Sequence, residues 1–377
     1  MEYDYLIIGA GLAGCTAGRL LAQAGARVLA VDRADLDAKD KLCGGLLTPR
    51  AQKLAGALLG EQVQGLVRQR HTEMTVLFNG RVQPLEGVDV AGVMRRDLDR
   101  LALERYLGAG GNLADRCRVE RLGLAGGRAV LRLESGEAPV RFATLVAADG
   151  AASATRKAVC RQAAERLGVL GRNVAQAAKR RALLADSPQV LPSLEAFVEP
   201  VDAPLTGMIC PAERGYCWYI PCGDTANIGV DAQPGTPSAQ LRGMLDGFAQ
   251  QLGVRVPAGA VRGAFIPSGG QPLLGVSAGG TQAFFVGDAA GLAAPATGEG
   301  IYYALQSARQ LAVSRISGGP GYSALMAKDV AQLQQQYRML GLLYSQKASN
   351  ALLGAADRLG AGQDALVRLA LKLFAAF

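Results

Sequence analysis

The stretch Tyr3-Asp4-Tyr5-Leu6-Ile7-Ile8-Gly9-Ala10-Gly11-Leu12-Ala13-Gly14 decides the fold of this chain. Its apolar first half is typical of a short buried strand, and its second half is the glycine pattern G-x-G-x-x-G. Helix-forming residues follow over 15–24, and a second apolar run over 27–31 ends at Asp32. This order of strand, glycine turn, helix, strand and acid predicts a β-α-β unit that binds a dinucleotide.

Each glycine of this motif has a physical task. Gly9 permits a tight turn, Gly11 lets the backbone approach a pyrophosphate, and Gly14 lets the helix pack against the strand. The helix N-terminus favours the negative phosphates, and Asp32 would accept hydrogen bonds from an adenosine ribose. The competing interpretation is a chance glycine cluster in a tight βα turn.

Two more glycine motifs follow apolar strands far along the chain. The first is Ala148-Asp149-Gly150-Ala151-Ala152-Ser153-Ala154-Thr155-Arg156, and the second is Val286-Gly287-Asp288-Ala289-Ala290-Gly291. One such loop could bind any nucleotide. Three loops so far apart in sequence indicate one long cofactor held at several points, which favours FAD.

The whole-chain numbers argue against several classes of protein. With 377 residues, half of them hydrophobic, the chain has material for about two domains. The net charge is +8, but the basic residues are scattered, so nucleic-acid binding is not expected. Seven cysteines without C-x-x-C pairs or zinc-like spacing argue against a metal site and favour a reducing cytoplasm. No apolar stretch is long enough to predict a membrane span.

The single histidine, His71, has no acidic or nucleophilic partner nearby in sequence. We expect it at the surface or at a domain edge, and we do not expect serine-histidine or cysteine-histidine catalysis. If the protein is an enzyme, a cofactor supplies the difficult chemistry.

The motifs divide the chain into interleaved pieces. We expect an α/β protein: a Rossmann-type FAD-binding domain, an inserted substrate domain with a mixed β-sheet, and a helical C-terminal region. The expected boundaries are 1–62, 95–165 and 273–320 for the FAD-binding domain, 63–94 and 166–272 for the substrate domain, and 321–377 for the C-terminal region. Locally, Thr48-Pro49 predicts a helix start, Asn79-Gly80 a hairpin turn, and residues 119–133 a hairpin around Gly126-Gly127.

Four stretches resemble one family of flavoproteins more specifically than the generic motifs do. They are Lys41-Leu42-Cys43-Gly44-Gly45-Leu46-Leu47-Thr48-Pro49-Arg50-Ala51, Arg95-Arg96-Asp97-Leu98-Asp99, Gly215-Tyr216-Cys217-Trp218-Tyr219-Ile220-Pro221, and Gly287-Asp288-Ala289-Ala290-Gly291 with Gly298-Glu299-Gly300-Ile301-Tyr302. In this order they resemble a K-x-C-G-G loop, an R-x-x-x-D helix entry, a Y-x-W-x-F-P strand and a GDAAG…GEGI flavin loop. The chain thereby resembles the FAD-dependent geranylgeranyl reductase family, especially its short bacterial CbrA-like members, within the p-hydroxybenzoate hydroxylase class.

The resemblance implies roles for particular residues. Asp288 would contact the ribityl chain, and the helix that starts after Gly298-Glu299-Gly300 would point its N-terminus at the flavin. Glu299 is equally well explained as a first-turn residue that complements the helix dipole. The full cofactor-binding set is Gly9, Gly11, Gly14, Asp32, Arg33, Lys41, Arg95, Asp149, Gly287, Asp288, Gly298, Gly300 and Ile301.

The loop Cys43-Gly44-Gly45 is implied to pass the face of the flavin as the catalytic loop. The competing interpretation is that this loop is a simple turn and that its cysteine is buried and unreactive. Tyr216, Trp218 and Ile220 alternate on the implied strand and would line an apolar substrate pocket, or be plain core. Cys222 replaces the family's lysine after the proline, so no charged role is implied there.

The favoured function is reduction of carbon-carbon double bonds in a hydrophobic, isoprenoid-like molecule by hydride from reduced FAD. The reductant would be NAD(P)H, bound transiently because there is no second G-x-G-x-x-G unit, or a ferredoxin-like donor. The alternatives are an aromatic monooxygenase, a halogenase, whose W-x-W-x-I-P motif is only partly matched, and a non-enzymatic flavin-bound lipid carrier or sensor. The sequence identifies no proton donor.

The C-terminal tail suggests a location. Residues 366–374 form an apolar helix pattern interrupted by Arg368 and Lys372. Such a helix most often packs on its own domain, and it is also suited to peripheral contact with the inner face of a membrane.

Overall fold

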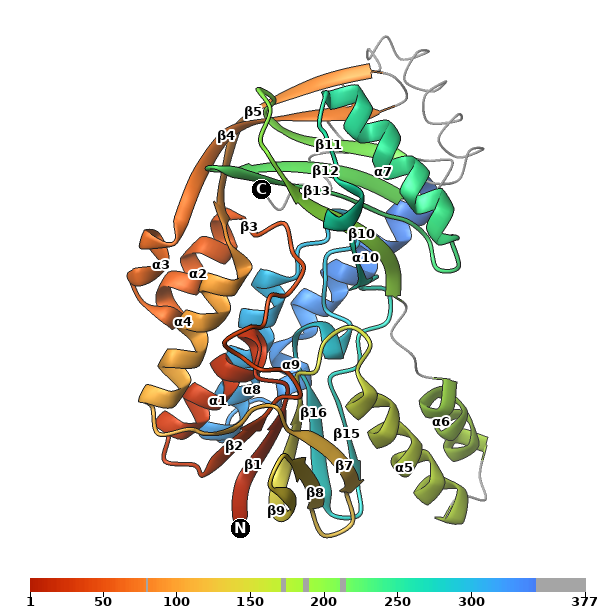
Figure 1. The fold of residues 1–377 in the computed structure, drawn as a ribbon. Coiled ribbons are helices and arrows are strands. Elements are labelled where there is room, and N and C mark those ends of the chain that lie inside the picture. Colours follow the sequence, from red (N-terminus) through yellow and green to blue (C-terminus); the bar gives the residue numbers. More distant parts are fainter. Residues whose placement is uncertain (79–80, 171–173, 186–189, 211–214, 344–377) are drawn as a thin grey trace.

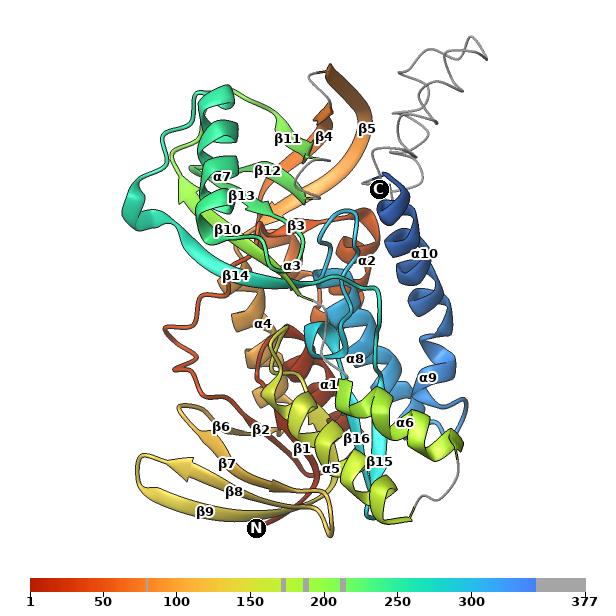
Figure 2. The same cartoon turned by 90° about the vertical axis from the view of Figure 1, so that its right-hand side faces the viewer.

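The computed structural model describes residues 1–78, 81–170, 174–185, 190–210 and 215–343. Within them the chain forms two mixed eight-stranded sheets, one above the other in Figure 1, with helices beside and between them. The N-terminus lies at the outer end of the lower sheet, and α10 (Ala327–Leu343) runs along the molecule toward the upper sheet (Figure 2).

The lower sheet is built around the first quoted stretch. Its main path has the order β15-β16-β9-β1-β2-β6, with β7 and β8 joined to it through β9. The pairs of β1 with β2 and with β9 are parallel, as a β-α-β unit requires. The strands are β1 (Glu2–Ile8), β2 (Val28–Val31), β6 (Asn112–Ala114), β7 (Arg118–Gly123), β8 (Arg128–Leu133), β9 (Gly136–Ala147), β15 (Gly275–Ala278) and β16 (Thr281–Phe285).

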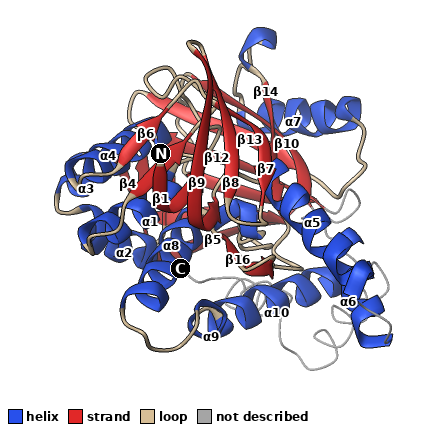
Figure 3. Cartoon of the chain, turned by 90° about the horizontal axis from the view of Figure 1, so that it is seen from below, coloured by secondary structure: helices blue, strands red, loops and turns tan. Residues whose placement is uncertain are grey.

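Helices cover this sheet because its central strands are apolar on both faces. The helix after the glycine turn, α1 (Leu12–Gln23), packs against α4 (Arg95–Gly108) and α8 (Ile301–Ile316). On the other side α5 (Ala154–Leu170) packs against β15, with α6 (Val174–Ala185) beside it (Figure 3). Short helices η2 (Gly287–Ala290) and α9 (Tyr322–Leu325) flank α8.

The upper sheet has the order β14-β10-β13-β12-β11-β4-β5-β3. It is mixed because β11 and β4 pair in parallel while its other pairs are antiparallel. One face is covered by α7 (Ser238–Leu252), whose Phe248 packs with Tyr219 and Ile228. The strands are β3 (Leu46–Leu47), β4 (Val67–Phe78), β5 (Arg81–Val93), β10 (Val190–Val198), β11 (Leu205–Cys210), β12 (Gly215–Cys222), β13 (Thr225–Asp231) and β14 (Arg262–Pro267).

The expected fold class is confirmed, and local signals located several elements. Helix α2 (Pro49–Leu59) begins where Thr48-Pro49 predicted, and Thr48 Oγ1 accepts the Ala51 N–H at 3.3 Å. The hairpin around Gly126-Gly127 is β7–β8. Short helices α3 (Gln62–Gly65) and η1 (Ala258–Ala260) complete the described elements. The Asn79-Gly80 turn and the apolar helix over 366–374 lie outside the described residues.

The domain boundaries differ from the expectation at two places. Helix α5 continues past residue 165 to Leu170 and packs with α6 beside the lower sheet, so the crossing to the upper sheet comes at β10. Strand β3 lies before residue 62 yet pairs with β5 of the upper sheet. Both differences arise because packing partners, which local sequence does not reveal, decide which sheet an element joins.

The expectation for His71 was wrong. This residue is 6% exposed, and its Nε2 lies 3.0 Å from the carbonyl oxygen of Pro221 on β12. Burial lowers its pKa. Among the described residues we find no helix long and apolar enough to cross a membrane. The same residues contain no group of three or more His, Cys, Asp or Glu side chains placed to hold a metal.

Candidate FAD and substrate site

The three glycine motifs meet at one end of the lower sheet. Gly9 has a positive φ of 106°, and a Cβ at this position would collide with the carbonyl of Ala148, at the start of the second motif. A Cβ on Gly287, in the third motif, would lie 3.1 Å from the Cβ of Ala13 in the first. These close approaches bring together segments more than a hundred residues apart in sequence.

A buried arginine ties the second motif to the third. Arg156 is fully buried, and its guanidinium donates to the carbonyl oxygen of Ala289 at 3.1 Å. The neighbouring Asp149 accepts from the hydroxyls of Ser153 (2.5 Å) and Thr155 (2.8 Å) and from the Thr155 N–H. Asp149 therefore orders its own loop and the start of α5.

Asp32 lies at the end of β2, 7% exposed. Its Oδ2 accepts the Ala10 N–H at 2.9 Å and pairs with Lys39 Nζ at 2.5 Å, while its Oδ1 accepts the Ala34 N–H. The carboxylate thus stabilises the glycine turn. It lies where the G-x-G-x-x-G motif with its following acid predicts a partner for the adenosine ribose. Arg33, which we also assigned to the cofactor, has an exposed side chain.

At the other end of the site, Asp288 is paired with Lys41. The distance from Lys41 Nζ to Asp288 Oδ2 is 2.7 Å. A Cβ on Gly300, which caps α8, would lie 3.4 Å from Asp288 Oδ1. The guanidinium of Arg95 is 6% exposed and donates to Asp99 at 2.9 Å. Although burial opposes its charge, Asp99, Cys43 and Asp288 raise the pKa of Arg95. Four of the predicted cofactor residues therefore gather here.

These features fit FAD. The N-terminus of α1 has no side-chain cap, and the space beside Gly11 is open, so backbone N–H groups can receive a pyrophosphate. Asp32 and Asp288 offer carboxylates suited to the ribose and ribityl hydroxyls, respectively. The N-terminus of α8, which begins at Ile301 and is also uncapped by a side chain, is suited to the flavin ring.

Strand β12 spans the gap between the two glycine loops predicted to face the flavin. A Cβ on Gly298 would collide with the hydroxyl of Tyr216, and a Cβ on Gly44 would collide with Cδ1 of Ile220. The rings of Tyr216 and Trp218 are 5.4 Å apart. All three predicted pocket residues thus share one face of β12 that runs from one loop to the other.

This face is continuous with an apolar cluster. Ile220 packs with the buried Val88, Val90 and Leu205, and the side chain of Trp218 adjoins them. The loop itself is held by the sheet, because Val93 donates its N–H to the Gly45 carbonyl at 2.9 Å and a Cβ on Gly45 would collide with the Val93 carbonyl. The face therefore suits an apolar ligand.

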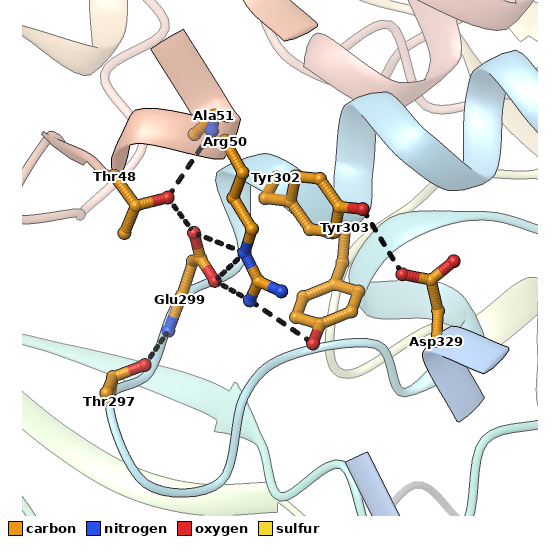
Figure 4. A network of polar contacts seen from close by, with 8 residues as sticks. All are labelled: Thr48, Arg50, Ala51, Thr297, Glu299, Tyr302, Tyr303 and Asp329. Atoms are coloured by element: carbon orange, nitrogen blue, oxygen red, sulfur yellow. Dashed lines mark hydrogen bonds and ion pairs between the residues drawn. The ribbon is translucent and has the colours of Figure 1, made fainter. Parts of the chain in front are cut away.

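An ionic network that the sequence did not reveal joins the two loops (Figure 4). Glu299 accepts hydrogen bonds from Thr48 Oγ1 and from both Nε and Nη2 of Arg50. The Arg50 guanidinium lies 4.2 Å from the centre of the Tyr302 ring and 5.1 Å from that of Tyr303. Glu299 thus pairs with α2 and is more than a first-turn complement to the helix dipole. No local pattern could have paired residues that are 249 positions apart.

The fold and this convergence of loops define a class: the protein is an FAD-dependent oxidoreductase of the type that pairs a dinucleotide-binding sheet with a second mixed sheet. Residues 2–236 match the model of the FAD binding domain family, and the chain belongs to that family.

Relatives and solved structures agree with this assignment. The chain is 31% identical over 330 residues to geranylgeranyl diphosphate reductase of Rhodobacter capsulatus, covering 83% of this chain and 74% of the relative. It is 30% identical over 324 residues to menaquinone reductase of Mycobacterium tuberculosis, covering 81% and 74%. A crystal structure of PqsL, a probable FAD-dependent monooxygenase from Pseudomonas aeruginosa, superposes with a TM-score of 0.65 at 20% identity, covering 92% of this chain and 96% of that one. The last similarity concerns the fold alone.

Proposed function

We propose that the protein reduces carbon-carbon double bonds of a hydrophobic, isoprenoid-like substrate. The observation that supports this most directly is the face of β12 between Gly298 and Gly44, where Trp218 and Ile220 join an apolar cluster and the Tyr216 ring lies beside Trp218. The two named relatives are reductases of a prenyl diphosphate and of a menaquinone, which is the same broad class of molecule.

In this proposal the bound FAD supplies hydride for the double bond. The chain's own residues bind and orient the two reactants. The N-terminus of α1 and Asp288 hold the cofactor, and the apolar face excludes water from the prenyl chain. The N-terminus of α8, which has no side-chain cap, would hold the flavin ring and would stabilise negative charge on it.

We propose the following reductant, loop and location. The electron donor is NAD(P)H or a ferredoxin-like protein, and the catalytic loop is Cys43-Gly44-Gly45. The proposed location is the cytoplasm, with peripheral contact at the inner face of the membrane as an option suited to a lipid substrate.

An anaerobic single-turnover experiment tests the reaction. The FAD-loaded protein is reduced with dithionite and mixed with geranylgeranyl diphosphate or with a menaquinone, without oxygen. We expect the flavin absorbance to return and the product to gain a pair of hydrogens for each bond reduced. Trp218→Ala should slow this step, whereas Phe265→Ala, at an exposed aromatic residue of the same sheet, should not. Product that forms only with oxygen and contains an added oxygen atom would instead establish a monooxygenase.

A further inference from the structure

A row of three hydrogen-bonded side chains lies beside the apolar face of β12. The indole Nε1–H of Trp218 donates to Asn227 Oδ1 at 2.6 Å, and Asn227 Nδ2 donates to Glu195 Oε2 at 3.1 Å. Asn227 is fully buried, and Glu195 is 3% exposed. Because an indole N–H can only donate, the amide oxygen of Asn227 must face Trp218 and its NH₂ group must face Glu195.

The sheet register explains how these three side chains meet. Trp218 on β12 pairs with Gly229 on β13, and Gly229 pairs in turn with Glu195 on β10. A Cβ on Gly229 would collide with the six-membered ring of Trp218. The indole therefore lies across β13 toward Glu195 because Gly229 has no side chain.

Gly44 of the implied catalytic loop lies next to this row of hydrogen bonds. A Cβ on Gly44 would lie 3.4 Å from Asn227 Oδ1 and 3.7 Å from Trp218 Nε1. The Trp218–Asn227 hydrogen bond is thus directly beneath the loop predicted to pass the flavin. A change in this bond would therefore alter the position of both the substrate-facing indole and the loop.

The carboxyl group of Glu195, at the end of this row of hydrogen bonds, changes charge near neutral pH. Burial raises the pKa of Glu195 to about 7, against the opposing effect of the Asn227 hydrogen bond. The charged groups that act on it are Arg262 on the neighbouring β14 and Lys41 of the loop, which lower its pKa, and Asp40, which raises it. Arg262 and Asp40 are themselves paired at 2.8 Å.

We propose that Glu195 is a positioning residue that acts through Asn227 to hold the Trp218 indole N–H away from the substrate, so that Trp218 presents only ring carbons to it. This inference rests on the proposed function and makes it more specific. The only polar atom of the indole is already satisfied inside the sheet, so a substrate unit seated there gains no hydrogen bond from it. A hydrocarbon segment loses no hydrogen bonds when it binds at this position, whereas a hydroxyl or carbonyl group would lose its hydrogen bonds to water without gaining a partner.

The protonation state of Glu195 sets the strength of both hydrogen bonds in this row. Ionised Glu195 is the better acceptor for the Asn227 NH₂ group, and it polarises the amide so that its oxygen binds the indole more tightly. The indole is therefore held more firmly above about pH 7 than below it.

Because Trp218 is the only tryptophan, its indole gives one nuclear magnetic resonance cross-peak when tryptophan is labelled with ¹⁵N. In the FAD-loaded protein we expect this N–H at low field with slow hydrogen exchange. Its shift should move with pH, with a midpoint near 7. Glu195→Gln should abolish that movement, and Asn227→Ala should shift the peak upfield and speed its exchange roughly tenfold, the equivalent of one lost hydrogen bond.

The matched control is Asp231→Asn, which removes another buried carboxyl group from the same sheet and should leave the titration intact. The inference is overturned if the indole titrates unchanged in Glu195→Gln, or if Asn227→Ala leaves its shift and exchange as they were. Glu195→Gln preserves size and hydrogen bonding, so it remains informative if Asn227→Ala does not fold.

A second measurement addresses the substrate. With geranylgeranyl diphosphate, Asn227→Ala should raise KM with little change in kcat, because the freed indole no longer offers a fixed surface. An unchanged KM would overturn the role in substrate positioning. The resonance experiment requires no turnover, so failure of the proposed reaction and failure of this inference can be told apart.

Discussion

Replacing Asp231 by asparagine should change how stability depends on pH. Asp231 is 1% exposed, and its Oδ1 accepts the Tyr216 N–H at 3.2 Å. Its Oδ2 has no hydrogen-bond partner among the described residues. Burial raises the pKa of this carboxyl group to about 8, and the hydrogen bond from Tyr216 offsets only part of the effect.

The sign and size follow from proton linkage. Between the ordinary pKa of 3.8 and about 8, the folded state keeps a proton that the unfolded state has released. The stability contribution of Asp231 is fully present below pH 3.8 and is lost as pH rises through about 8. The Asp231 contribution to the free energy of unfolding therefore falls by about 1.4 kcal/mol for each pH unit, or roughly 3 kcal/mol between pH 5 and pH 7.

The asparagine side chain has no proton to release, and its amide oxygen can still accept from Tyr216. We expect the stability of Asp231→Asn relative to the wild type to rise by roughly 3 kcal/mol between pH 5 and pH 7. Urea denaturation at a series of pH values measures this difference. Glu195 contributes equally to both proteins and cancels.

The control is Asp224→Asn, which changes an aspartate with an 88% exposed side chain and should leave the pH dependence as it is. If the unfolding free energies of wild type and Asp231→Asn stay parallel from pH 5 to pH 8, the carboxyl group is not held neutral by burial and the reasoning fails.

Three other changes test the site. Gly298→Ala should destabilise the protein by about 1–3 kcal/mol, because φ is +65° and the new Cβ meets the Tyr216 hydroxyl; urea denaturation should show part of this loss recovered with Tyr216→Phe, and no recovery would contradict the contact. Asp288→Asn should weaken FAD retention by roughly 10- to 100-fold, measured by flavin fluorescence on dilution, through loss of charge-assisted hydrogen bonds; unchanged retention would remove Asp288 from the cofactor set. Arg50→Met should cost about 3 kcal/mol in urea denaturation because it leaves Glu299 buried and unpaired, whereas Arg50→Met with Glu299→Met should cost less; an equal or larger cost for the double change would refute this.

Much of the FAD-binding half could be predicted because its signals are local. A strand, a glycine turn and a helix occupy consecutive residues, so Gly9 and Gly14 are constrained by neighbours only a few positions away. The helix start at Thr48 was readable for the same reason, since the cap acts over three residues. The similarity of longer stretches to a known family then predicted a second sheet with a strand that faces the substrate.

Local sequence gave no information on most polar partners of the site. Lys41 and Asp288 are 247 positions apart, and Arg50 and Glu299 are 249 apart. His71 was misplaced because one polar residue in a strand does not show which neighbouring strand covers it. These pairings depend on the packing of elements that are distant in sequence, such as α2 against α8.

The sequence by itself determined the dinucleotide-binding unit and the start of α2, because glycine turns and helix caps act between near neighbours. The resemblance of longer stretches to a known family indicated the class of enzyme. Only the tertiary structure decided that Glu195 and Asn227 lie behind Trp218. That arrangement requires three strands in one register with a glycine between them. Burial and register are properties of the assembled sheet, and they give a carboxyl group such as Glu195 its altered pKa and its partner.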